Sequence, residues 1–242
     1  MSSHEQGPKP RADERLALGI VFGAVGAAVL GSLFVAFAPA LPDRTPPPKA
    51  EATKTIREDI AADVDAAVAA AISAMARADT VVVEAEAVVA RVRSQRDGES
   101  ATLANGLVFR GEVLDGAPEG AGSLRGGSTA FGAGFFVGGV RSGPGADCQR
   151  ADCGGPSYFG DYRADSPTGV ARIIYPDGSV YRGDVRNGAP DGFGELRKTD
   201  GMFYRGAFAA GVREGYGVEA NATGPTKAGF WKADQLSEEL RS

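Results

Sequence analysis

A periodic pattern of aromatic residues and glycines in the C-terminal half constrains the fold more than any other feature of this 242-residue sequence. The unit is an aromatic residue, any residue and a glycine, and its aromatics recur at steps of 27, 22, 23 and 23 residues. The units are Phe109 with Gly111, Phe136 with Gly138, Tyr158 with Gly160, Tyr181 with Gly183, and Tyr204 with Gly206. Such a period predicts stacked copies of one supersecondary unit that bury a common core.

A second glycine register follows most of these aromatics by eleven residues, as a pair of glycines one residue apart. The clearest pairs are Gly192 with Gly194 and Gly215 with Gly217. Because side chains alternate along a strand, Tyr181, Gly183 and Val185 would share one face. The glycines would leave room for a tyrosine ring to lie across the backbone. The pattern predicts a mainly β fold, a ladder of hairpins over residues 101–232, with a turn at 187–191.

Residues 181–194 (YRGDVRNGAPDGFG) and 204–217 (YRGAFAAGVREGYG) resemble the MORN (membrane occupation and recognition nexus) repeat, and weaker copies extend the resemblance over the ladder. The unit at Phe136 departs from the pattern, because its glycine pair begins only seven residues later and residues 147–156 are inserted. The hairpin register there is left open. The resemblance implies a single-layer sheet of hairpins and a scaffolding role through protein–protein or membrane-proximal contacts. It implies no substrate.

The N-terminal region predicts a membrane anchor after a polar tail at residues 1–15. Residues 16–38 contain no charged side chain and would span about 34 Å as a helix, close to the roughly 30 Å of a bilayer's hydrocarbon core. A cleaved signal peptide is the alternative, because Ala38-Pro39-Ala40 resembles a cleavage site, but the length of the apolar run favours an anchor. The segment therefore predicts a single-pass transmembrane helix.

The sequence also predicts how this segment is oriented in the membrane and whether it associates with a second copy. Basic residues flank it almost evenly, and a short tail before a first helix usually stays cytoplasmic, which places the repeats outside, in the periplasm or the extracellular space. Small residues recur every four positions at Gly19, Gly23, Ala27 and Gly31. That spacing lines one helix face and predicts a homodimer contact.

A proline-rich linker at residues 39–54 precedes an alanine-rich helix predicted over residues 55–98. Thr55 and Glu58 offer a capping box, and Gly98 offers a C-terminal cap. Apolar residues alternate at steps of four and three from Ile60 to Val92, as in a coiled coil. Three roles are open: a dimeric stalk, a helix packed back on the β-domain, and a partner-binding helix. The pattern favours the stalk.

The residue inventory argues against an enzyme. One histidine, His4, and two cysteines, Cys148 and Cys153, leave no material for most triads or for a zinc site, so we predict no catalytic, cofactor-binding or metal-binding residues. The cysteines predict a disulfide if the repeats lie outside the cytoplasm, and free thiols otherwise. Residues 101–242 carry 15 basic and 17 acidic side chains, which argues against nucleic-acid binding and against electrostatic adhesion to lipid.

The function expected from these features is a membrane-anchored scaffold or adaptor that mediates protein–protein assembly, with an unidentified protein partner. The alternative is a module that binds lipid or a cell-envelope polymer through the open face of the ladder. Residues 233–242 are expected to form a C-terminal cap, with a helix from Asp234 to Leu240 covering the last sheet edge.

Overall fold

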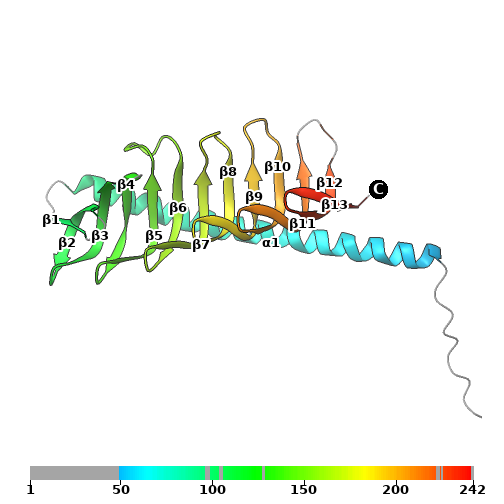
Figure 1. Cartoon of the computed structure of the whole chain (residues 1–242), viewed down its shortest axis with the longest axis horizontal. Coiled ribbons are helices and arrows are strands. Elements are labelled where there is room, and N and C mark those ends of the chain that lie inside the picture. Colours follow the sequence, from blue (N-terminus) through cyan, green and yellow to red (C-terminus); the bar gives the residue numbers. More distant parts are fainter. Residues whose placement is uncertain are drawn as a thin grey trace, which may run out of the picture. The chain divides into compact units, whose positions relative to one another are not determined.

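The computed structural model describes residues 49–95, 99–103, 106–126, 129–221, 224 and 226–240. In this part of the chain one helix, α1 (Lys49–Ser94), precedes thirteen strands that pair in chain order into a single antiparallel sheet (Figure 1). The strands are β1 (Glu99–Thr102), β2 (Val108–Leu114), β3 (Ala117–Gly126), β4 (Thr129–Val137), β5 (Val140–Cys148), β6 (Ser157–Arg163), β7 (Ser166–Ile174), β8 (Val180–Arg186), β9 (Ala189–Arg197), β10 (Phe203–Ala209), β11 (Val212–Ala220), β12 (Lys227–Lys232) and β13 (Gln235–Glu239). The predicted mainly β hairpin ladder is therefore confirmed.

Several predictions fall on residues outside the described ranges. They are the polar tail, the transmembrane helix at 16–38 with Gly19, Gly23, Ala27 and Gly31, and the linker up to residue 48.

Six hairpins make up β2 to β13, and each closes through two residues with positive φ, as a type I′ turn requires. Asn187 (φ 51°) and Gly188 (φ 78°) form one of these turns, so β9 begins at Ala189, inside the segment predicted as a turn. The six turns lie along one edge of the sheet, the turn edge. The longer connections between hairpins form the opposite, loop edge, which is uppermost in Figure 1.

The structure gives the repeat register of the hairpin β4–β5, which the sequence left open. Gly183 pairs with Gly194 in the hairpin β8–β9, and the corresponding pair in β4–β5 is Gly134 with Gly145. Gly132 therefore occupies the tyrosine position of its repeat. Phe136 lies four residues further along the strand, and Gly138 belongs to the turn. The predicted unit of Phe136 with Gly138 is wrong because an aromatic residue can also occupy that later position, as Tyr162 and Phe208 do.

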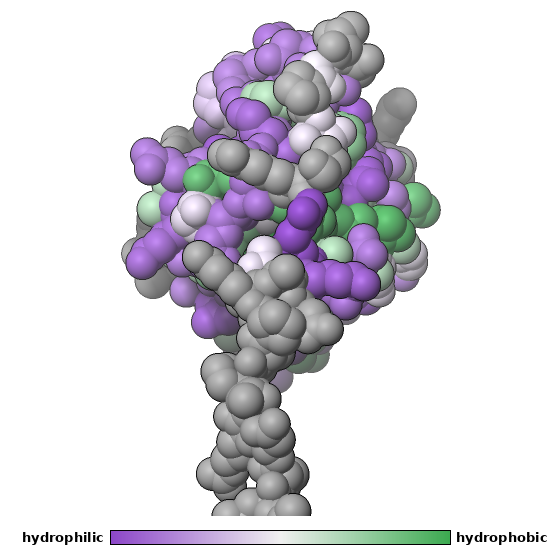
Figure 2. All heavy atoms as spheres, turned by 90° about the vertical axis from the view of Figure 1, so that its right-hand side faces the viewer, coloured by the Kyte–Doolittle hydropathy of each residue, from purple (hydrophilic) through white to green (hydrophobic). Residues whose placement is uncertain are grey.

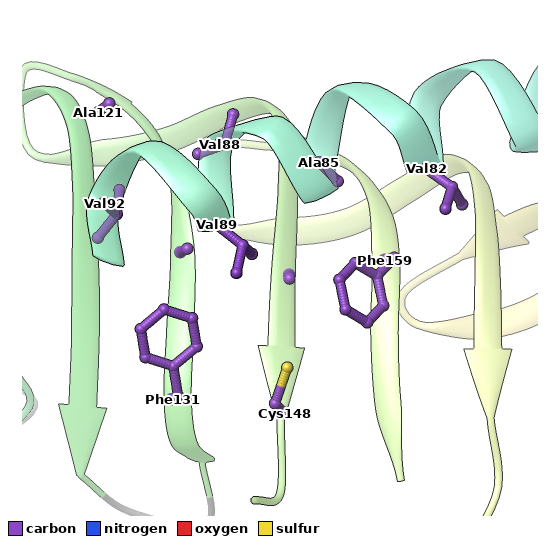
Figure 3. Packing of buried hydrophobic residues seen from close by; sticks show 11 residues of the cluster. Val82, Ala85, Val88, Val89, Val92, Ala121, Phe131, Cys148 and Phe159 are labelled. Atoms are coloured by element: carbon purple, nitrogen blue, oxygen red, sulfur yellow. The ribbon is translucent and has the colours of Figure 1, made fainter. Parts of the chain in front are cut away.

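Helix α1 lies across the strands and covers one face of the sheet, here called the helix face. Its buried seam consists of Val64, Ala67, Ala71, Ala74, Ala78, Val82, Ala85, Val88, Val89 and Val92. The last valines of the seam form one cluster with Phe131, Cys148 and Phe159 of the strands, and Val89 and Val92 point toward the side of Phe131 (Figure 3). The predicted dimeric stalk is thus corrected, since this seam packs on the sheet of its own chain.

The dimensions of a helix and of a hairpin explain why a coiled-coil pattern fits a sheet. Seven helical residues advance about 10.5 Å. Two neighbouring strands occupy about 9.6 Å. One heptad of α1 therefore advances by nearly one hairpin, and the same positions of each heptad meet equivalent positions of successive repeats.

The bounds of α1 also differ from the predicted 55–98, because the helix begins at Lys49 and ends at Ser94. The helix therefore begins before Thr55, the residue at which the predicted capping box would have started it. Within the described residues, α1 from Arg57 to Ser94 is long and apolar enough to cross a membrane by length and composition. Its apolar seam is nevertheless buried on the sheet, so we assign it as the cover of the helix face.

The C-terminal segment forms a strand where a capping helix was predicted. Ala233 (φ 47°) and Asp234 (φ 67°) make a type I′ turn that folds β13 back on β12. The exposed edge strand carries two charged residues, Glu238 and Glu239, which discourage pairing with another sheet. Seen from the end at which β13 lies, the coloured surface is mostly hydrophilic (Figure 2).

Candidate binding surface of the ladder

A row of aromatic rings covers the face opposite α1, here called the tyrosine face. Tyr181 is fully buried, and its Oη donates a 2.7 Å hydrogen bond to the carbonyl oxygen of Asp184. A Cβ atom added at Gly183 or Gly194 would lie 2.7 or 2.5 Å from that Oη. The glycines are therefore the space in which the ring lies. Tyr204 repeats this arrangement over Gly206 and Gly217.

The tyrosines of this row are structural and stay neutral. Burial raises the pKa of Tyr158, Tyr181 and Tyr204 well above the ordinary value. Each hydroxyl donates to a backbone carbonyl of its own strand. The hydrogen bonds of these hydroxyl groups hold the rings in position. Because their pKa values are raised, the hydroxyl groups cannot serve as general bases near neutral pH.

Arg141 fills the space left where Gly132 replaces the tyrosine. A Cβ at Gly134 would lie 2.5 Å from the Arg141 side chain, much as a Cβ at Gly194 would meet the tyrosine. The guanidinium lies 3.6 Å from the centroid of the Tyr162 ring and donates to both carboxylate oxygens of Asp147, at 2.9 and 3.0 Å. Tyr162 donates a further 2.9 Å bond to Asp147. An ion pair thus replaces the apolar ring in this repeat.

Arg213 forms an equivalent cluster in the hairpin β10–β11. Its guanidinium lies 4.2 Å from the ring centroid of Trp231 and donates a 2.5 Å bond to Glu219. Its amide donates 2.9 Å to Asp234, as the Arg141 amide does to Asp165 at 2.8 Å. The corresponding position in the other hairpins from β2 to β11 is proline, at Pro118, Pro167 and Pro190. These clusters had no signal in the aromatic and glycine pattern.

Two hollows open beside these clusters. The larger, of about 300 Å³, is lined by Asp147, Cys148, Gln149, Pro156, Ser157, Tyr158, Pro167, Ile173, Ile174, Tyr175, Pro176 and Gly188. The smaller, of about 80 Å³, is lined by Leu196, Lys198, Met202, Phe203, Tyr204, Arg213 and Glu219. The larger lining is rich in proline, aromatic and aliphatic side chains, whereas the smaller one combines apolar and aromatic side chains with three charged ones. Such surfaces suit apolar side chains of a partner.

The helix face carries arginines of several strands, whose charges are neutralised by acidic neighbours. Glu195, buried in the sheet, accepts hydrogen bonds from Arg182, Arg197 and Arg205. Burial works to raise the pKa of Glu195, but the bond from Arg205 and the charges of Arg197 and Arg205 outweigh it and lower that pKa. Helix α1 supplies further partners.

Three ion pairs tie α1 to the sheet. Arg77 pairs with Asp184 at 2.9 Å, Asp79 with Arg182 at 3.5 Å, and Glu86 with Arg172 at 2.7 Å. The helix face is therefore occupied by α1 through both its apolar seam and its charges.

A short loop on the loop edge touches the end of α1. Cys148 and Cys153 form a disulfide that closes this loop. Arg93 of α1 donates a 2.7 Å bond to the carbonyl of Ala151 and lies 3.4 Å from the Cys153 sulfur. Gln149 of this loop and Pro156, which follows the loop, line the larger hollow. The loop thus contacts α1 on one side and the tyrosine face on the other.

Exposed aliphatic side chains gather at the turn edge. Leu114, Val137, Val140 and Val212 each flank a type I′ turn and are between 37% and 61% exposed. Among the described residues, no group of three or more His, Cys, Asp or Glu side chains could hold a metal ion.

The comparison with protein families agrees with this repeat geometry. The family model of the MORN repeat matches residues 158–180, 181–203 and 204–226. Each copy begins at one of the ring-forming tyrosines, and the three copies follow one another without a gap. No curated protein matches the sequence. The chain therefore contains three MORN repeats, which follow one another over residues 158–226.

Proposed function

We propose that this protein is a membrane-anchored scaffold that assembles another protein on its repeat ladder. The observation that carries the proposal is that α1 and the sheet are packed together through a long buried seam and three ion pairs. A helix fixed in this way makes the ladder a firm platform. A firm surface binds a partner with less loss of conformational entropy than a mobile one.

The tyrosine face is the surface that we assign to the partner. Helix α1 occupies the helix face, whereas the hollows beside Tyr158 and Tyr204 are open. The role is one of binding, because the tyrosines of the ladder are buried and the sequence offers one histidine, His4. We propose no cofactor and no enzymatic activity.

The membrane part of the proposal rests on the apolar sequence at residues 16–38. Carbonate extraction of membranes from the source cells tests it. The full chain is expected in the membrane pellet, and a variant without residues 16–38 in the supernatant. Recovery of the full chain in the supernatant would remove the anchor from the proposal.

Assembly with a partner is tested on the full chain, tagged at its C-terminus and purified in mild detergent. Native mass spectrometry is expected to show a complex with a second polypeptide at a fixed stoichiometry. The chain alone, or its homodimer alone, would count against the scaffold.

A lipid- or polymer-binding module is the second candidate, favoured by the exposed Leu114, Val137, Val140 and Val212 at the turn edge. Residues 47–242 form one compact unit and suit a vesicle-sedimentation assay without the anchor. Sedimentation with phosphatidylglycerol vesicles that is lost when Val137 and Val140 are both changed to Ser would favour this candidate. Binding to purified cell-envelope polymer is measured in the same way.

A further inference from the structure

The connection between β5 and β6 is built differently from the two connections that follow it in the ladder. It consists of the eight residues 149–156, whereas the connections β7–β8 and β9–β10 have five residues each. In all three, a backbone hydrogen bond joins the first residue to the last, here the Gln149 amide to the Pro156 carbonyl oxygen at 3.0 Å. The disulfide between Cys148 and Cys153 is therefore not needed to close this connection.

The two sulfur atoms of this disulfide lie in different surroundings. Cys148 is 1% exposed and belongs to the apolar cluster that the strands form with the last turns of α1. Cys153 is half-buried, and the residues on either side of it in the loop are exposed. A thiolate must reach the sulfur that it attacks, so a thiol from solution has access to Cys153 and not to Cys148.

The accessible sulfur lies beside a positive charge. The guanidinium of Arg93, in the last turn of α1, lies 3.4 Å from the Cys153 sulfur. The loop itself adds little net charge, because Arg150 and Asp152 pair with each other at 3.4 Å. A cation beside a cysteine favours the thiolate form of that cysteine. For the same electrostatic reason, it attracts an incoming thiolate.

We propose that Cys153 is the site at which small anionic thiols open and close this disulfide, and that Arg93 attracts them to it. In the opening direction, the thiolate sulfur of the small thiol forms a bond with the Cys153 sulfur. The bond to Cys148 breaks, its electron pair stays on the Cys148 sulfur, and that sulfur takes up a proton from water. In the closing direction, Cys148 gives up the proton and displaces the small thiol from Cys153. This site is independent of the scaffold role, because it needs no partner protein.

The first test treats the full chain, oxidised and in detergent, with glutathione as the probe, and iodoacetamide then blocks every free thiol. Arg150 lies between the two cysteines, so trypsin places them in separate peptides, residues 142–150 and 151–163. Mass spectrometry without reductant is expected to find glutathione on residues 151–163 and the carbamidomethyl group on residues 142–150. Glutathione on residues 142–150, on both peptides equally, or on neither would overturn the inference.

The second test compares the rates at which glutathione and cysteamine form the mixed disulfide. The ammonium group of cysteamine cancels the charge of its thiolate, so the ratio of the two rates reports on charge and not on a loosened loop. Arg93→Ala and Arg93→Gln are expected to lower this ratio about threefold, the effect of one nearby charge that is partly screened by water. Arg93→Lys, which keeps the charge, should leave most of it.

The matched control is Arg91→Ala, which removes an exposed charge from the same turn of α1 and should leave the ratio unchanged. Circular dichroism checks the fold of every variant, and Arg93→Gln keeps the test decisive if the alanine variant unfolds. A ratio that Arg93→Gln leaves unchanged, or that Arg91→Ala lowers equally, would overturn the role of Arg93.

Discussion

At the scale of single residues, the ladder depends on glycine wherever a ring crosses the backbone. At Gly194 a Cβ would lie 2.5 Å from the Tyr181 hydroxyl oxygen and 2.7 Å from the carbonyl oxygen of Arg182. The Tyr181 ring cannot move aside to make room for this Cβ, because it is fully buried among neighbouring repeats. In the preceding repeat the equivalent residue is Ala171. Glycine is therefore required only where the ring lies as close to the backbone as Tyr181 does, and not at this position of every repeat.

Gly194→Ala is therefore expected to destabilise the ladder by about 2–3 kcal/mol, the usual cost of overpacking a closed site. Chemical denaturation monitored by circular dichroism measures the change. Ala171→Gly is the control, with an expected cost of about 1 kcal/mol or less. Equal effects of the two substitutions would contradict the role assigned to the Tyr181 ring.

Two acidic residues, Glu84 on α1 and Asp161 on the sheet, predict how the stability of the protein depends on pH. Arg77 pairs with Asp184, and Glu84, one heptad later, faces Asp161, the equivalent of Asp184 in the preceding repeat. Burial raises the pKa of Asp161, the bond from the Val170 amide opposes the rise, and the charge of Glu84 adds to it. A raised pKa in the folded state means that the folded protein holds this proton more tightly. Stability is therefore lost as pH rises through the folded-state pKa.

Glu84→Arg should remove this loss by pairing with Asp161 as Arg77 does with Asp184. We expect a gain of about 0.3–1 kcal/mol near pH 7, the range of a partly exposed ion pair, shrinking as pH falls and Asp161 is protonated. Urea denaturation at several pH values measures it. Glu84→Gln is the control and should recover only part of the gain. A gain that does not depend on pH would show that Asp161 is not the partner.

The repeat register shows what the sequence could and could not predict at this scale. The period, the glycine pairs and the turn dipeptides placed most hairpins, because each depends on local backbone geometry. The register around Phe136 stayed open because Arg141, which fills the tyrosine space above Gly134, comes from the next strand of the hairpin. An arginine replacing a ring across two strands leaves no local pattern.

At the scale of elements, the sequence identified the buried seam of α1 but not what it packs against. A heptad repeat can pack against a second helix. It can also pack against a ladder in which each hairpin advances by nearly the length of one heptad. The charges on either side of the seam would have been informative only with the sheet register known, since Asp79 and Glu86 meet Arg182 and Arg172. The same limit applied to β13, where a turn of Ala233 and Asp234 had no glycine or asparagine to mark it.

Ala78→Leu separates the two arrangements of the seam. Ala78 of α1 is fully buried in the seam that faces the sheet, so a larger side chain should lift the helix from the sheet and destabilise the protein by about 1–3 kcal/mol. In a dimeric coiled coil the same change would deepen a thin interface and raise stability with protein concentration. Thermal unfolding at two concentrations measures both effects. Ala76→Leu, on the exposed side of α1, is the control.

Reduction of the disulfide should loosen the end of α1. The loop closed by Cys148 and Cys153 holds the carbonyl of Ala151 against Arg93. Without the disulfide the loop gains conformational freedom, so Arg93 loses a fixed acceptor. Hydrogen exchange of the amides at residues 89–94 is expected to become faster with reductant. Arg93→Ala should show the faster exchange in both states, and unchanged exchange on reduction would refute the coupling.

At the scale of the whole molecule, an open sheet of thirteen strands has two free edges that invite association. Head-to-tail stacking of translated copies would set β13 beside the next β1. Both are odd-numbered strands of an alternating sheet, so they would run parallel and break the antiparallel pattern. Glu238 and Glu239 add charge at the C-terminal edge. The sheet is therefore ended by its chain direction and by its charges.

Removing the charge at this edge tests whether the ladder is protected from pairing with itself. Residues 47–242 form one compact unit, and we expect them to show no growth of large species as concentration rises. Glu238→Val combined with Glu239→Val should expose an apolar edge strand and allow two copies of β13 to pair antiparallel, the direction that twofold symmetry permits. Analytical ultracentrifugation is expected to show a concentration-dependent dimer for this variant. Val137→Glu with Val140→Glu, at the turn edge, is the control for altered surface charge. Growth of long assemblies in place of a dimer would mean that chain direction does not limit association, and that the acidic residues alone end the sheet.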